Sequence, residues 1–106
     1  MEHALDRLFA TVAARKTAGE ADKSYTAQLL SKGMTHVAKK FGEEAVETIL
    51  AAAGGDKTEI AKESADMLYH LTVLWAAAGV TPDDVYAVLK AREAQSGLEE
   101  KAARKK

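Results

Sequence analysis

The sequence contains no cysteine, and this absence excludes several kinds of chemistry at once. Disulfide bridges, thiolate zinc sites and cysteine nucleophiles all need a residue that the chain does not have. A chain without cysteine is compatible with a reducing cytosol, so we expect a cytoplasmic protein.

Proline and glycine are scarce, with one proline and seven glycines among 106 residues. Alanine, leucine, lysine and glutamate are abundant, and all four favour helices. No segment alternates polar and apolar residues at the period of two that a half-buried strand shows. The sequence therefore predicts an all-α protein with a single domain, residues 1–106, in which residues 97–106 form a flexible tail.

Long hydrophobic runs and a strong charge of one sign are also missing. The most apolar stretch, residues 67–80, contains His70 and is too short to span a bilayer, so we expect no membrane partner. Residues 1–20 carry charges throughout, which argues against a signal peptide. The net charge is −1, and without a basic field we expect no nucleic-acid partner.

Four or five helical segments can be read from the periodicity, and the shorter ones lie toward the two ends of the chain. Residues 3–17 carry apolar side chains at helical spacing. Ser24 is a candidate N-cap of a short helix that Gly33 ends. Thr81-Pro82 supplies a cap and a proline at the first position of a final helix, which fades near Ser96-Gly97.

Two long helices occupy the middle of the chain and are separated by Gly54-Gly55. The first is expected to begin at Thr35 and to reach about Ala53. The second follows Asp56, a candidate N-cap, and stops at Gly79. Because the connection is short, we expect the two helices to fold into an antiparallel hairpin.

Acidic residues from both long helices are expected at one height of this hairpin. Glu47 lies seven residues before Gly54-Gly55 and Glu63 eight after it, while Glu44 and Asp66 lie ten before and eleven after. At ~1.5 Å per residue each pair is level within roughly one residue's rise. The rotation of each helix decides whether the carboxylates face each other, and the sequence leaves that open.

Each long helix is expected to carry an apolar face, with the acids opposite it on the first helix and along its flank on the second. The apolar positions are Met34, Val37, Phe41, Ala45, Ile49 and Ala52 on the first helix, and Ile60, Leu68, Leu71 and Trp75 on the second.

Small-residue surfaces at residues 51–53 and 76–78, with Leu74 and Trp75, are expected to pack against a second copy. A chain this short buries a modest core by itself, so we predict a homodimer.

Four carboxylates held together repel one another, and a hard divalent cation offsets that repulsion. Mg²⁺ and Mn²⁺ take oxygen ligands, neutralise polyphosphates and lower the pKa of bound water. Alternatively, the acids form a solvated surface in which Lys39 and Lys40 pair with Glu43 and Glu44. The residues alone leave both interpretations open.

Two segments carry a family pattern: KFGEEAVE at residues 40–47 and ESADMLYHL at residues 63–71. Their acids follow the order Glu-Glu-x-x-Glu and then Glu-x-x-Asp, which resembles the MazG-like all-α nucleotide pyrophosphohydrolases. Ser-Tyr-Thr at residues 24–26 and SGLEEK at residues 96–101 are similar to one branch, the phosphoribosyl-ATP pyrophosphohydrolases. Ala94 departs from that branch, in which glycine is frequent, and this affects the local turn and not the chemistry.

The resemblance implies hydrolysis of phosphoribosyl-ATP to phosphoribosyl-AMP and pyrophosphate in L-histidine biosynthesis, by a homodimer with active sites between its subunits. It implies Mg²⁺, with Mn²⁺ as a substitute, held by Glu44, Glu47, Glu63 and Asp66. Glu43, Glu44 and Glu47 are the candidates for the catalytic group that orients or deprotonates water. The implied substrate-binding residues are Lys40, Lys39, Ser24, Thr26 and Arg92.

Three other functions compete with this one. A di-iron bundle needs Glu-x-x-His on two helices, and neither His36 nor His70 follows an acid by three residues. A house-cleaning (deoxy)nucleoside triphosphate pyrophosphohydrolase would use the same acids on a simpler substrate. A non-enzymatic dimerisation module would use them only as a surface.

Overall fold

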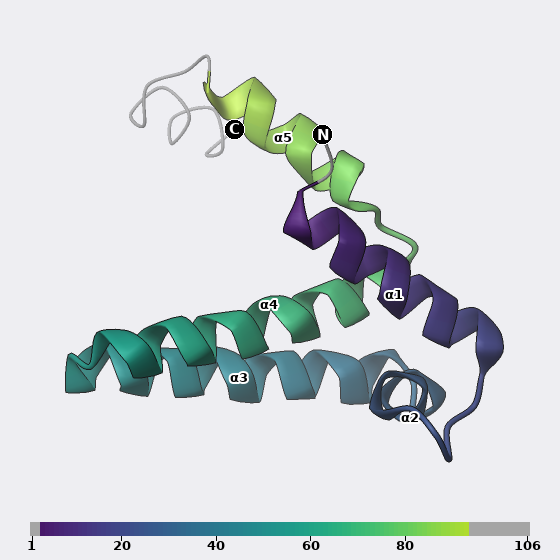
Figure 1. Ribbon diagram of the computed structural model, residues 1–106. Coiled ribbons are helices and arrows are strands. Elements are labelled where there is room, and N and C mark those ends of the chain that lie inside the picture. The colour runs from purple at the N-terminus through teal and green to yellow at the C-terminus, as the bar shows by residue number, and fades with distance from the viewer. Residues whose placement is uncertain (1–2, 94–106) are drawn as a thin grey trace.

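All regular secondary structure in the described part of the chain is helical. The computed structural model describes residues 3–93, and these contain five helices and no strand (Figure 1). The helices are α1 (Ala4–Ala18), α2 (Tyr25–Ser31), α3 (Met34–Gly54), α4 (Lys57–Ala78) and α5 (Pro82–Glu93). None of them is both long and apolar enough to cross a membrane. The all-α prediction is confirmed, whereas the predictions for Ala94, residues 96–101 and the tail lie outside the described residues.

The long helices end where the sequence predicts. Gly55 and Gly79 have φ of 77° and 76°, a left-handed conformation that glycine adopts without steric strain, and they close α3 and α4. Asp56 caps α4, because its carboxylate accepts the backbone N–H groups of Thr58 and Glu59 at 2.9 and 3.3 Å. These local signals fix the turn of the hairpin.

Helices α2 and α5 also begin at their predicted caps. The Ser24 hydroxyl accepts the N–H of Ala27 at 3.2 Å and so starts α2. Before α5, the Thr81 hydroxyl accepts the N–H of Asp84 and the Asp84 carboxylate accepts the N–H of Thr81. This reciprocal capping box places Pro82 at the first helical position, where its missing N–H costs nothing.

Alanine in place of Asp56 is expected to destabilise the protein by about 1 kcal/mol, because two N–H groups of α4 lose their acceptor. For a domain of this size the loss lowers the midpoint of thermal unfolding by roughly 4–8 °C. Circular dichroism during heating measures it. Asp22→Ala, in the exposed loop before α2, is the control and should leave the midpoint unchanged. Equal midpoints for both variants would show that the cap contributes nothing.

The core lies at one end of the hairpin and not along its whole length. Helices α1 and α2 pack against the end where α3 begins and α4 finishes, and the turn between α3 and α4 projects beyond them (Figure 1). The buried core residues are Val12, Leu29, Val37, Val73 and Ala76. The half of the hairpin nearer its turn therefore carries side chains that no other described helix covers.

The predicted apolar face of α3 is partly wrong. Met34 and Ile49 are 43% and 65% exposed, whereas Val37 is buried in the core. At ~100° per residue, Glu44 and Thr48 point within about 20° of Val37, and Ile49 points about 120° away. Packing of α1 and α2 around Val37 therefore turns Glu44 toward the inside of the hairpin. The prediction that Glu44 lies opposite the buried face is wrong for the same reason.

The predicted dimer surface near the end of α4 is also wrong. Trp75 and Ala76 are buried, and Leu74 packs against the core of the same subunit. The most exposed of the large apolar side chains of the hairpin lie instead on α3, where Val46, Ile49 and Leu50 are 53–65% exposed. Their i, i+3, i+4 spacing places them on one face of the helix.

Candidate functional site

Three carboxylates from the two hairpin helices come together. Glu44 of α3 and Glu63 and Asp66 of α4 each have one carboxylate oxygen within 4.8 Å of the others. Glu44 and Glu63 are half-buried and Asp66 is exposed. Sequence spacing placed Glu44 level with Asp66, and the structure shows that both carboxylates also lie beside Glu63. Oxygen ligands at this separation, held by two rigid helices, are suited to one hard divalent cation.

The other two candidate acids lie beside this group. Glu47 lines a surface depression close to the hairpin turn, together with Glu63. Glu43 is exposed, and one of its carboxylate oxygens lies 3.3 Å from the ammonium nitrogen of Lys40. The five predicted acids therefore share one region of the hairpin, and three of them form the tight cluster.

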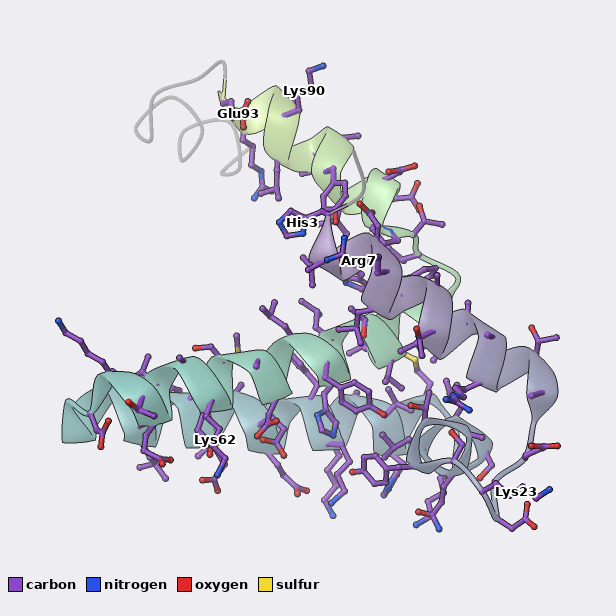
Figure 2. All side chains as sticks on the ribbon, in the orientation of Figure 1. His3, Arg7, Lys23, Lys62, Lys90 and Glu93 are labelled. Atoms are coloured by element: carbon purple, nitrogen blue, oxygen red, sulfur yellow. The ribbon has the colours of Figure 1, made fainter. Side chains whose placement is uncertain are left out.

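Glu63 is the acid of the cluster whose pKa is shifted by its surroundings. Partial burial raises the pKa of its carboxyl group above the ordinary value, and the negative charges of Asp66, Glu44 and Glu47 raise it further. Lys62 acts in the opposite direction, and Figure 2 shows its side chain projecting from the same hairpin. Negative charge is thus concentrated where an all-oxygen donor set fits Mg²⁺ or Mn²⁺.

A hydroxyl group joins the two helices at the level of these acids. Thr48 Oγ1 lies 2.9 Å from the backbone carbonyl oxygen of Glu44 and 3.1 Å from that of Glu63. The first carbonyl is on the same helix and the second is across the hairpin. The sequence pattern assigned no role to Thr48, although its position four residues after Glu44 places both side chains on one face of α3.

Aromatic side chains adjoin the acid cluster on α4. His70 is buried, and its Nδ1 lies 2.9 Å from the carbonyl oxygen of Asp66. A carbonyl oxygen only accepts, so Nδ1 carries the hydrogen and Nε2 accepts the Tyr25 hydroxyl at 3.5 Å. Tyr25 is 53% exposed, and its ring stacks on that of Tyr69 at 6.3 Å. An exposed aromatic ring is therefore linked through His70 to the backbone of Asp66.

The predicted substrate-binding residues of α2 already have partners within the subunit. The Ser24 hydroxyl caps α2. Thr26 is buried and shares a hydrogen bond with the Tyr69 hydroxyl. Burial also raises the pKa of the Tyr69 phenol. These contacts hold α2 against α4 beside the acids.

The predicted basic residues occupy two separate places. Lys39 and Lys40 are on α3, one turn before the acids, and Lys40 forms the ion pair with Glu43. Arg92 is on α5, which extends away from the hairpin (Figure 1). Figure 2 shows its neighbours Lys90 and Glu93 at that distant end. Within one subunit, the structure therefore brings Lys39 and Lys40, and not Arg92, close to the acid cluster.

Comparison with known proteins gives one consistent result. The family model for phosphoribosyl-ATP pyrophosphohydrolase matches residues 5–93. The phosphoribosyl-ATP pyrophosphatase of Parvibaculum lavamentivorans is 59% identical over 100 residues, which cover 94% of this chain and 91% of that protein. The Azospirillum brasilense protein of the same name is 56% identical over 101 residues, with 95% and 90% covered. That of Rhizorhabdus wittichii is 53% identical over 106 residues, with 100% and 99% covered.

Proposed function

This chain belongs to the phosphoribosyl-ATP pyrophosphohydrolase family, and we propose that it hydrolyses phosphoribosyl-ATP to phosphoribosyl-AMP and pyrophosphate in the cytoplasm. This reaction is the second step of L-histidine biosynthesis. The observation that carries the proposal is the carboxylate cluster of the hairpin, formed by the family's acid motif within a match that covers residues 5–93. Hydrolysis of a phosphoric anhydride requires that phosphate charge be neutralised and that a water molecule be activated.

Glu44, Glu63 and Asp66, with Glu47 beside them, are the residues that would hold Mg²⁺, and Mn²⁺ could replace it. When bound, the ion neutralises polyphosphate charge and lowers the pKa of water. The half-buried positions of Glu44 and Glu63 support this role, because oxygen ligands with few competing waters bind a hard cation more strongly.

Glu43 and Lys40 are proposed to act on the water and the phosphates. Glu43 is a candidate to orient the attacking water or accept its proton, along with Glu44 and Glu47. The Lys40 ammonium group is now 3.3 Å from Glu43, and a substrate phosphate would offer it a more highly charged partner. Transfer of Lys40 to phosphate would release the Glu43 carboxylate for the water. Lys39, exposed on the same turn, is a second phosphate contact.

The α2 residues are proposed to bind the nucleoside end of the substrate. Tyr25 presents an exposed ring beside His70, and aromatic rings bind nucleobases by stacking. The hydroxyls of Ser24 and Thr26 remain candidate hydrogen-bond partners for substrate. Their present contacts with Ala27 and Tyr69 set the position of α2.

We also propose that the active enzyme is a homodimer. The face of α3 formed by Val46, Ile49 and Leu50 is largely exposed in one subunit, and a second copy would cover it. Exposed apolar patches of this kind mark protein interfaces more often than free surface. Arg92 is in the last turn of α5, which extends away from the hairpin that carries the acids (Figure 1), so its predicted contact with substrate would be made in the site of the partner.

A substrate panel separates this function from its nearest alternative. Phosphoribosyl-ATP, ATP and the four dNTPs would be compared as substrates at equal Mg²⁺, with pyrophosphate release as the measurement. We expect kcat/KM for phosphoribosyl-ATP to exceed that for ATP by at least about 100-fold, since a site that binds the extra phosphoribosyl group loses that binding energy with ATP. A preference for dNTPs would indicate a house-cleaning enzyme, and no release from any nucleotide would indicate a dimerisation module.

A further inference from the structure

Thr48 makes the hydroxyl contact between α3 and α4 at the acid cluster. Its Oγ1 is within hydrogen-bonding distance of two carbonyl oxygens, at 2.9 Å in its own helix and 3.1 Å in the other. A hydroxyl has one hydrogen, so it donates to one carbonyl at a time or is shared between them. The contact with α3 is the ordinary bond of a helical threonine to the carbonyl four residues earlier. The contact with the Glu63 carbonyl is of a different kind, because it joins α3 to α4.

Both acceptors belong to residues of the acid cluster. The carbonyl oxygens are those of Glu44 and Glu63, whose carboxylates lie within 4.8 Å of each other and of Asp66. A single side chain therefore bridges the backbones that carry the two half-buried carboxylates. Sliding or rotation of α4 against α3 would lengthen the bond to Glu63 and move its carboxylate relative to Glu44.

The close approach of the helices at Thr48 is opposed by the charge of the cluster. A side-chain oxygen 3.1 Å from the opposite backbone shows that the two helices lie close together at this position. The like charges of the cluster act against this approach, since they repel at the same level of the hairpin. A neutral hydrogen bond to the backbone opposes that repulsion whether or not a cation is bound.

We propose that Thr48 is a positioning residue: its hydroxyl holds the backbones of Glu44 and Glu63 at the separation at which their carboxylates bind a small divalent cation. This inference rests on the proposed function, in which these acids are the metal ligands. Because the bond joins a side chain to the backbone and does not involve the cation, it positions the ligands by itself, and less of the binding free energy is spent on bringing the helices together.

The test is Mn²⁺ binding to the purified full-length protein without substrate, measured by isothermal titration calorimetry. Thr48→Val keeps the shape and removes the hydroxyl, whereas Thr48→Ser keeps the hydroxyl and removes the methyl group. We expect valine to weaken Mn²⁺ binding roughly 10-fold, the effect of losing a group that supports a metal ligand. Serine is expected to stay within about two-fold of the wild type, at the scale of a minor packing change. Thr17→Val, which removes an exposed hydroxyl bond within α1, is the control and should bind normally.

Kinetics with phosphoribosyl-ATP provide the second measurement. In Thr48→Val the Mg²⁺ concentration that gives half-maximal rate should rise by the same factor, while kcat at saturating Mg²⁺ stays within about two-fold, because the ligands themselves are intact. If the valine variant does not fold, Thr48→Ala and Thr48→Ser are compared, and only alanine should lose affinity.

Three results would overturn the inference: wild-type affinity in the valine variant, equal loss in the valine and serine variants, or a lower kcat with unchanged metal affinity. Failure of the proposed function would look different, since the wild-type protein would then bind no Mn²⁺ or release no pyrophosphate.

Discussion

Glutamine in place of Glu63 is expected to lower the rate of pyrophosphate release by more than about 100-fold, beyond the usual effect of changing a residue that only supports a metal ligand. Glutamine keeps the size of the side chain and removes the negative charge that would bind the cation. One carboxylate oxygen of Glu63 lies within 4.8 Å of oxygens of Glu44 and Asp66, and the charge of Glu47 also acts on it. Steady-state release of pyrophosphate at saturating Mg²⁺ measures the loss.

The same substitution should leave the fold intact. The pKa of Glu63 is raised, so its charge is disfavoured in the folded protein, and removing it relieves repulsion with its neighbours. The unfolding midpoint of the metal-free variant is therefore expected to hold or rise. Glu20→Gln, in the exposed loop after α1, is the control and should keep full activity. Near wild-type activity in the Glu63 variant would remove this residue from the site.

Aspartate in place of Ile49 is expected to convert the proposed dimer into an inactive monomer. Ile49 is 65% exposed at the centre of the apolar face that includes Val46 and Leu50, and a buried charge without a partner opposes association. Light scattering at micromolar protein should show the dimer mass fall to about that of one 11.3 kDa chain, together with loss of turnover.

Ile49→Val is the matched control, because it keeps an apolar side chain and should remain dimeric and active. Aspartate at Leu74 would not be informative in the same way, since that side chain packs against the core of its own subunit. An active wild-type species with the mass of a single chain would contradict the proposed dimer and the role of Arg92 across it.

Sequence reasoning succeeded where the determinants are local. The cap at Asp56 and the left-handed glycine at Gly79 depend on a few neighbouring residues, and both helix ends lie where expected. The level match of Glu44 and Asp66 follows from helix rise and a short turn alone. Trp75 lies on the predicted apolar face of α4, and it is buried within its own subunit instead of at the predicted dimer surface.

The rotation of α3 about its own axis could not be predicted from the sequence. The apolar pattern of α3 favoured a face containing Ile49, but α1 and α2 pack around Val37 and turn the helix so that Glu44 faces inward. That rotation depends on contacts between distant segments. The contact of Thr48 with the Glu63 carbonyl and that of Tyr25 with His70 depend on it too. The family resemblance named Glu44, Glu63 and Asp66, whose carboxylates lie together in the structure, without this information, because a motif records the residues and not their orientation.

The central claim is that the hairpin carboxylates support metal-dependent hydrolysis of phosphoribosyl-ATP. Its most direct test is the release of phosphoribosyl-AMP and pyrophosphate by the purified protein, followed with Mg²⁺, with excess chelator, and after Mg²⁺ is restored. We predict stoichiometric formation of both products with Mg²⁺, no turnover in chelator, and recovery when the metal returns. Full turnover in excess chelator, or no release of pyrophosphate with Mg²⁺ present, would contradict the claim.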